Sequence, residues 1–134
     1  MRLRAMLYLV PLAVAGCGYT NSAGGESPAG CDAPVFERRL DALRASIDDE
    51  IGEAGATDVA ACRTLPLGAK PCGGPWTYLV YSAEASDAAR LAELAAEYDS
   101  VDAERNRACG LASDCMMAMP PEVVLANGRC VAAR

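Results

Sequence analysis

The cysteine content limits this chain more than any other feature of its sequence. There are seven cysteines among 134 residues, and the chain has no histidine. Beyond residue 16 only 27 side chains are large and apolar, because much of the 52% hydrophobic fraction is alanine. Disulfides each add roughly 2–4 kcal/mol to the stability of a small domain, and a core this lean needs that contribution. We therefore expect a single compact domain stapled by disulfides.

The first 16 residues have the pattern of a signal peptide. Arg2 and Arg4 give a positive start, and an apolar run of eleven residues follows from Ala5 to Ala15. This run is shorter than the roughly 20 residues that a membrane-spanning helix needs, but it suits a cleaved targeting segment. No later stretch of the sequence approaches 18 consecutive apolar residues.

Residues 12–17 (LAVAGC) resemble the lipobox of bacterial lipoproteins, in which a branched apolar residue and two small residues precede a cysteine. In that family the thiol receives diacylglycerol, a dedicated peptidase cuts just before the cysteine, and the new amino group receives an acyl chain such as palmitate. The resemblance implies lipidation of Cys17 and attachment to a membrane. Gly18 replaces the Asp that favours inner-membrane retention, which implies an outer-membrane protein facing the periplasm or the cell surface. The alternatives are an ordinary signal peptide with a chance cysteine, or a buried apolar helix.

The expected organisation has three parts. Residues 1–16 form the signal peptide, residues 17–30 the lipidated Cys17 and a flexible tether, and residues 31–134 one globular domain. The tether is predicted from its Gly, Ser and Pro content. With Arg2 and Arg4 removed, ten basic residues face 18 acidic ones, so nucleic acid is not an expected partner.

Six cysteines remain once Cys17 is set aside, and an even number outside the cytoplasm predicts three disulfides. They are Cys31, Cys62, Cys72, Cys109, Cys115 and Cys130. Their spacing fits no tetrathiolate zinc template and there is no histidine to assist, so we expect no metal and no cofactor. Six cysteines allow 15 pairings, which sequence alone does not resolve.

Two segments have helical periodicity. Apolar residues at intervals of 4, 3, 4 and 4 predict a helix within residues 34–55, and 3,4,3 spacing predicts a second helix over residues 87–107. If these helices pack antiparallel, Cys31 and Cys109 become neighbours. For the other four cysteines the local alternatives are Cys62 with Cys72, and Cys115 with Cys130.

Strand patterns lie between and after the helices. Residues 76–81 (WTYLVY) predict a strand with Trp76, Tyr78 and Val80 on one face, and residues 64–67 predict a short partner. Asn127-Gly128 between residues 122–126 and 129–132 predicts a tight hairpin. The expected fold is therefore α+β, a small disulfide-stapled domain of two helices with a small antiparallel sheet.

The segment between the two predicted strands carries a second resemblance. Gly68, Lys70 and the run Cys72-Gly73-Gly74-Pro75, with the later Cys115 and Cys130, resemble the core of small uncharacterised bacterial envelope lipoproteins. The resemblance implies an envelope lipoprotein and supplies no activity. The Gly-Gly-Pro run itself predicts a sharp turn beside a disulfide; anion binding by its N–H groups is the alternative, but the P-loop pattern is missing.

Candidate binding residues are a lone lysine and amphipathic aromatics, which favour recognition. They are Lys70, Trp76, Tyr78 and Tyr81, and the plainer alternative is that the aromatics fill a small core. Met116, Met117 and Met119 offer thioether ligands that suit Cu(I), although methionine also fills irregular cores.

The leading functional hypothesis is a lipid-anchored, non-enzymatic binding or envelope-structural module. Its expected partners are the membrane, through the lipid on Cys17, and an envelope protein or peptidoglycan. The alternative is an inhibitor of a hydrolase. A histidine-independent enzyme needs paired carboxylates, and Asp99 with Asp102 reads as a chance pair on the surface of an acidic helix.

Overall fold

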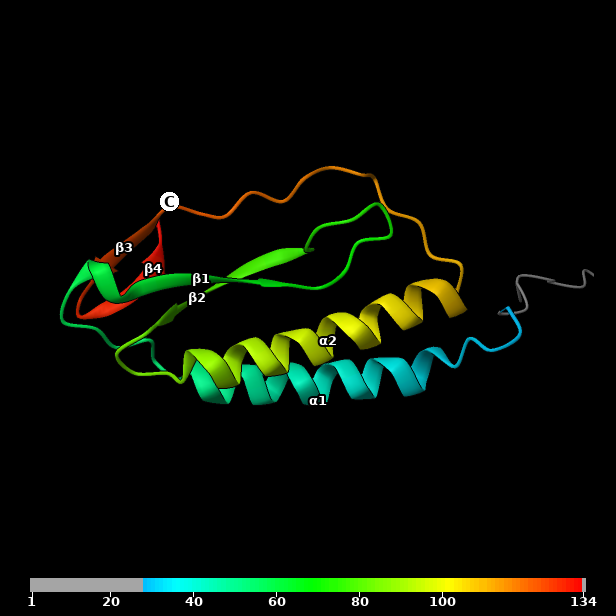
Figure 1. Ribbon diagram of the computed structural model, residues 1–134, viewed down its shortest axis with the longest axis horizontal. Coiled ribbons are helices and arrows are strands. Elements are labelled where there is room, and N and C mark those ends of the chain that lie inside the picture. The colour runs from blue at the N-terminus through cyan, green and yellow to red at the C-terminus, as the bar shows by residue number, and fades with distance from the viewer. Residues whose placement is uncertain (1–27, 134) are drawn as a thin grey trace, which may run out of the picture.

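The computed structural model describes residues 28–133, so the predicted signal peptide, Cys17 and most of the predicted tether lie outside the described residues. The described chain is an α+β domain, which confirms the expected fold class (Figure 1). Its elements in order are α1 (Ala33–Ile51), the 3-10 turn η1 (Val59–Ala61), β1 (Cys62–Leu67), β2 (Thr77–Ser82), α2 (Ala88–Ala108), β3 (Val123–Ala126) and β4 (Arg129–Ala132).

Both helices begin at an aspartate that caps them. The Asp32 carboxylate accepts the N–H of Val35 at 3.1 Å, and the Asp87 carboxylate accepts two N–H groups of the first turn of α2. Helix α1 ends at Ile51, and Gly52, with a φ of 54°, turns the chain out of the helix. Of the two glycines that suit the end of this helix, Gly52 and Gly55, the structure uses the first. The two helices lie side by side in opposite directions (Figure 1).

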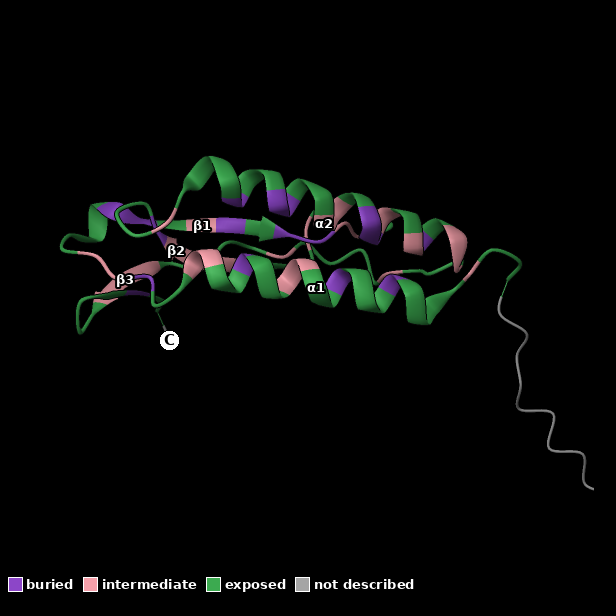
Figure 2. Cartoon of the chain, turned by 90° about the horizontal axis from the view of Figure 1, so that it is seen from below, coloured by how far each residue is buried: buried purple, intermediate pink, exposed green. Residues whose placement is uncertain are grey.

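The strands form two antiparallel pairs instead of one sheet. β1 pairs with β2, with Leu65 opposite Leu79, and β3 pairs with β4 around the predicted Asn-Gly turn. The β1–β2 hairpin covers the helix pair, and the main core lies between them. Buried residues therefore face inward on both helices, while the outer helix faces are exposed (Figure 2). The core residues are Ile47, Leu65, Leu67, Leu91, Leu94 and Ala95.

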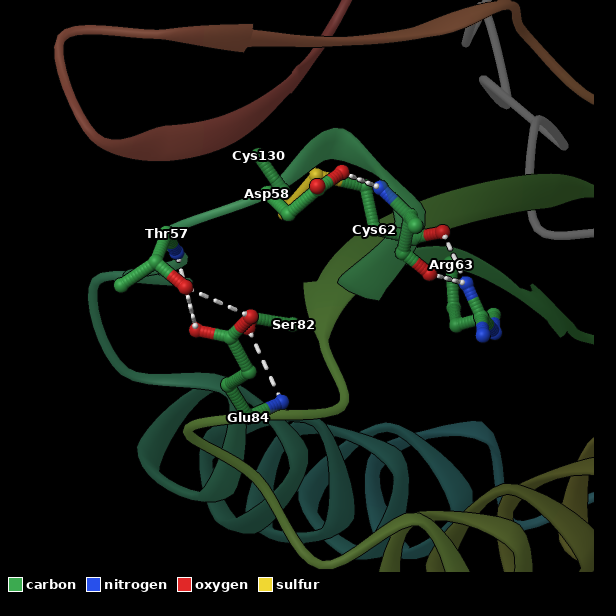
Figure 3. The surroundings of a disulfide bond; sticks show 8 residues. Thr57, Asp58, Cys62, Arg63, Ser82, Glu84 and Cys130 are labelled. Atoms are coloured by element: carbon green, nitrogen blue, oxygen red, sulfur yellow. Dashed lines mark hydrogen bonds between the residues drawn. A yellow bond between two sulfur atoms is a disulfide. The ribbon is translucent and has the colours of Figure 1, made fainter.

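A smaller core at one end joins the second hairpin to the rest. Cys62 of β1 and Cys130 of β4 form a disulfide whose residues are 5% and 4% exposed, and both pack against Ala54. Two backbone bonds support this end, from Cys130 N–H to the Ala54 carbonyl and from Ala56 N–H to the Gly128 carbonyl, each 2.9 Å. Beside the disulfide, the Thr57 hydroxyl donates to the Glu84 carboxylate (Figure 3). This bond joins the segment before β1 to the turn after β2.

The structure contains three disulfides, and their pairing corrects part of the expectation. Cys31 pairs with Cys109, as antiparallel helices predict. Cys62 pairs with Cys130 and Cys72 with Cys115, so the local alternatives were wrong. The reason is the β1–β2 register: Cys62 lies opposite Ser82 at the open end of the hairpin, whereas Cys72 lies in the loop at its closed end. The two cysteines therefore lie at opposite ends of the hairpin.

Among residues 28–133, no helix combines the length and the apolar character that crossing a membrane requires.

Candidate functional site

The loop of residues 68–75, which we call the glycine loop, joins β1 to β2 at the end of the molecule where α1 begins (Figure 1). Its ends are closed by the Trp76 N–H, which donates to the Leu67 carbonyl at 3.0 Å. Inside it, Gly73 N–H donates to the Lys70 carbonyl and Lys70 N–H to the Gly74 carbonyl. Gly73 and Gly74 have φ of 94° and 81°, so the predicted sharp turn is confirmed.

Helix α2 holds the base of this loop through three polar side chains. The Asp99 carboxylate accepts the Gly68 N–H at 2.6 Å, and the Asp102 carboxylate accepts the Ala69 N–H at 2.8 Å. The Asn106 amide donates to the Ala69 carbonyl at 2.5 Å. The loop backbone is therefore satisfied by a helix rather than by solvent.

Asp102 is the centre of this arrangement. It is 1% exposed, and it also accepts the indole N–H of Trp76 at 2.7 Å and a guanidinium N–H of Arg105 at 2.6 Å. Arg105 in turn donates to Glu37 of α1 at 2.8 Å. The expectation that Asp99 and Asp102 form a chance surface pair was wrong for Asp102, because a fully buried carboxylate is stable only when its partners compensate for lost water.

A pattern in the sequence could have revealed that Asp102 is buried. Asp102 and Asn106 continue the spacing of the buried apolar residues along α2, so they occupy core positions of that helix. A polar residue at a core position needs a buried partner. The 3,4,3 spacing of large apolar residues ends at Val101, one residue before Asp102, so it did not include either polar residue.

Burial also affects the neighbouring carboxyl group. Loss of water raises the pKa of Asp99 above its ordinary value, and the nearby Asp102 carboxylate adds to the rise. The Gly68 N–H opposes both by stabilising the carboxylate. Asp99 therefore holds the loop with a carboxylate that is partly removed from water and accepts the Gly68 N–H.

Lys70 and a disulfide tie the other side of the loop to the segment of residues 111–119, which we call the methionine segment. The Lys70 ammonium donates to the Met116 carbonyl at 2.6 Å and lies 3.4 Å from the Asp114 carboxylate. Together with the Met116 N–H, which has the larger effect, Lys70 lowers the pKa of Asp114. The lysine also lies 5.3 Å from the centre of the Trp76 ring, and Cys72 is bonded to Cys115.

The structure brings three of the four candidate binding residues to this loop. Lys70, with a side chain only 9% exposed, acts as a brace, whereas Trp76 is 40% exposed beside it. Tyr78 lines a cleft of about 300 Å³ with Gly74 and Met117. Tyr81 packs against the core between the helices and β1, away from the loop.

The predicted common face of Trp76, Tyr78 and Val80 does not form. Trp76 precedes β2 and turns its indole N–H to Asp102 of α2, whereas Val80 packs near the Cys62–Cys130 disulfide. The alternation of a strand therefore does not extend back to residue 76.

Shallow clefts flank the loop on several sides. The largest, about 480 Å³, lies between the loop and the end of α2 and is lined by residues that include Lys70, Asn106, Arg107 and Leu111. Another of about 320 Å³ includes Asp99 and Gly73. The glycine loop therefore lies between shallow clefts and contributes residues to each of them.

The methionines of the neighbouring segment are not core fillers. Met116, Met117 and Met119 are 69%, 84% and 73% exposed. Within residues 28–133 no cluster of three His, Cys, Asp or Glu side chains could hold a metal, and Cys115 is consumed in a disulfide. A Cu(I) site there would have only the three thioethers as ligands.

Comparison of the chain with protein-family models, with curated proteins and with solved structures finds no match.

Gly68 is the position where the loop geometry is most demanding. A Cβ added there would clash with Cδ1 of Trp76, and the φ of Gly68, 91°, disfavours any side chain. We expect Gly68→Ala to lower the free energy of unfolding by about 2–4 kcal/mol, since the strained backbone and the clash add together. Urea unfolding followed by the emission of Trp76, the only tryptophan of the chain, measures this loss.

Gly73→Ala is the matched control. Gly73 has a similar φ of 94°, but an added Cβ would meet no atom within 4 Å. Gly73→Ala is therefore expected to lower the free energy of unfolding by about 1–2 kcal/mol, from the strained backbone alone. Equal losses in the two variants would contradict the close approach of Gly68 to Trp76.

Proposed function

We propose that this chain is a lipid-anchored protein of the bacterial cell envelope that acts by binding rather than by catalysis. The lipobox-like residues 12–17 support the anchor. The three disulfides of the described chain support a compartment outside the cytoplasm, since disulfides persist in oxidising environments. The lipid on Cys17 is then the attachment to the membrane, and Gly18 favours the outer membrane.

The glycine loop is the proposed binding surface. Five side chains and one disulfide hold it (Asp99, Asp102, Asn106, Lys70, Trp76 and Cys72–Cys115), yet its tip stays exposed. A loop ordered in advance loses little conformational entropy when a partner docks. The buried carboxylate of Asp102 is occupied by this bracing, which supports a structural use of the Asp99–Asp102 pair. The partner class is another envelope protein or peptidoglycan.

Replacing Cys17 tests the anchor. In wild-type cells, the intact mass of the mature protein is expected to exceed that of residues 17–134 by a diacylglyceryl group and an acyl chain, and the protein should fractionate with the outer membrane. Cys17→Ser removes the thiol that receives the lipid, so the lipid mass should disappear. A control substitution at Cys72, which leaves Cys17 intact, should keep it. An unmodified wild-type N-terminus would contradict the proposal.

A photo-reactive residue tests the binding surface. Placed at Tyr78, beside the loop tip, it is expected to give one discrete adduct in intact cells, or the protein is expected to sediment with purified peptidoglycan sacculi. The same residue at Ala45, exposed on α1, is the control for the adduct and should give no discrete adduct. Identical adducts from both positions, with no sedimentation, would argue against a binding surface at the loop.

A further inference from the structure

The methionine segment carries half of the exposed large apolar side chains of the described residues. They are Leu111, Met116, Met117 and Met119, with Trp76 next to them. The other large apolar residues exposed among residues 28–133 are three separate valines, Val35, Val59 and Val131. Single exposed apolar residues are ordinary in soluble proteins, but a cluster of flexible thioethers marks a surface that another phase or molecule covers.

The segment also lacks free charge. Asp114 is the one ionisable residue of residues 111–119, and its carboxylate lies 3.4 Å from the Lys70 ammonium. Lys70 is itself withdrawn from solvent. The segment together with Lys70 therefore carries no net charge, which lowers the cost of removing it from water.

The rest of the molecule fixes these side chains on the outside. The Leu111 N–H donates to the Asn106 carbonyl at 2.9 Å, Lys70 holds the Met116 carbonyl, and Cys115 is bonded to Cys72. Three attachments within six residues prevent the segment from folding its methionines inward. Their exposure is thus built into the fold.

The described chain begins near the point where this segment leaves α2. Cys31 is bonded to Cys109, with 4.7 Å between the Cα atoms, and the methionine segment starts two residues after Cys109. Figure 1 shows the start of α1 and the end of α2 at the same end of the molecule. Fourteen residue steps separate Cys17 from Cys31, a reach of at most about 50 Å, and seven steps separate Cys109 from Met116, at most about 25 Å. A lipid on Cys17 can therefore hold the segment at the bilayer.

Charge favours the same orientation. Acidic residues gather at the opposite end of the helix pair, where α1 ends and α2 begins: Asp48, Asp49, Glu50, Glu53, Glu84 and Asp87. Bacterial membranes with anionic lipids repel such a cluster and tolerate a neutral apolar surface. The end with the methionines can thus face the membrane while the acidic end faces water.

We propose that the methionine segment is a second membrane contact, in which Met116, Met117 and Met119 enter the interfacial region of the bilayer that holds Cys17. Its partner is the lipid surface, and the inference rests on the proposed lipidation. Thioether side chains suit this role because they are apolar and adapt their shape, and tryptophan is enriched at the same depth. Because Cys72 is bonded to Cys115 of the segment, the glycine loop then lies next to the membrane surface.

Trp76 provides the readout. Lys70 Nζ lies 5.3 Å from its ring centre and 2.6 Å from the Met116 carbonyl, so the ring is within about 8 Å of the segment backbone. Lipidated full-length protein, purified from membranes, is reconstituted into phosphatidylcholine vesicles with and without lipids brominated near the headgroup. Bromine is expected to quench Trp76 emission. The quenching should be equally strong when phosphatidylglycerol is added, because the contact is apolar.

The test variant replaces Met116, Met117 and Met119 by Gln, which keeps side-chain length at exposed positions. It is expected to lose the quenching while still floating with the vesicles through its lipid. The control variant, Val59→Gln with Val131→Gln, changes exposed apolar residues elsewhere and should keep the quenching. Unquenched wild-type protein that floats would overturn the membrane contact and leave the anchor intact, as would quenching that needs anionic lipid. Unlipidated wild-type protein would instead overturn the proposed function.

Discussion

Asp102→Ala is expected to lower the free energy of unfolding by about 3–5 kcal/mol, because it removes one partner of a buried ion pair and leaves the others unsatisfied. The variant leaves the Arg105 guanidinium, whose side chain is 19% exposed, with Glu37 as its remaining carboxylate partner. It leaves the indole N–H of Trp76 and the N–H of Ala69 without their acceptor. Each unpaired buried donor adds to the loss. Urea unfolding monitored by circular dichroism measures the change, and Trp76 emission is expected to shift toward that of a solvated indole.

Two further variants separate the charge from the geometry. Asp102→Asn keeps an acceptor oxygen and the side-chain shape but loses the charge, and we expect an intermediate loss of about 2 kcal/mol. Glu104→Ala, on the same helix, breaks only an exposed pair with Arg39 at 3.7 Å, and should change stability by less than about 1 kcal/mol. If Asp102→Ala were no more damaging than Glu104→Ala, Asp102 could not be the centre of the loop bracing.

Removing the buried disulfide with Cys62→Ala and Cys130→Ala is the second large effect. The bond joins residues 68 apart, and the chain-entropy relation for such a loop gives about 4 kcal/mol. Loss of the two buried sulfur atoms leaves space that the small Ala54 cluster cannot refill. Chemical denaturation without reductant measures the loss of stability.

The damage is expected to concentrate in the β3–β4 hairpin. Its strands have four residues each, and an isolated two-stranded hairpin is marginally stable in water. Hydrogen exchange at Val124 and Val131 should therefore accelerate more than at Leu91 of the main core. The control is Cys72→Ala with Cys115→Ala, which removes an exposed disulfide and should leave β3–β4 exchange near the wild-type rate. Uniform acceleration across both hairpins would contradict a local role for the Cys62–Cys130 bond.

The elements of this fold were predictable because they depend on neighbouring residues. The 3-4 apolar spacing, the capping aspartates and Asn127-Gly128 act over a few positions, and the helices and both hairpins form where these patterns lie. The Cys31–Cys109 bond followed as well, since antiparallel helices bring their opposite ends together. The α+β class therefore needed no long-range information.

The site was predictable only in part, because its bracing depends on contacts far apart in the chain. The glycine-rich turn is visible locally, but Asp99 and Asp102 reach it across 31 and 33 residues. Lys70 was expected as a free cation of a binding surface and instead spans to residues 114 and 116. The pairing of Cys62 and Cys72 depends on which end of a hairpin each occupies, which is fixed only once both strands have paired.

The disulfide connectivity also sets an order of events during biosynthesis. The first three cysteines of the domain, Cys31, Cys62 and Cys72, each pair with one of the last three. As the chain emerges from its N-terminus, no native bond can close until α2 and Cys109 have appeared, and Cys130 arrives later still. An oxidase that joined cysteines as they emerged would link two of the early three to each other. Such bonds have to be reopened by thiol–disulfide exchange, so maturation of this protein is expected to depend on a disulfide isomerase as well as an oxidase.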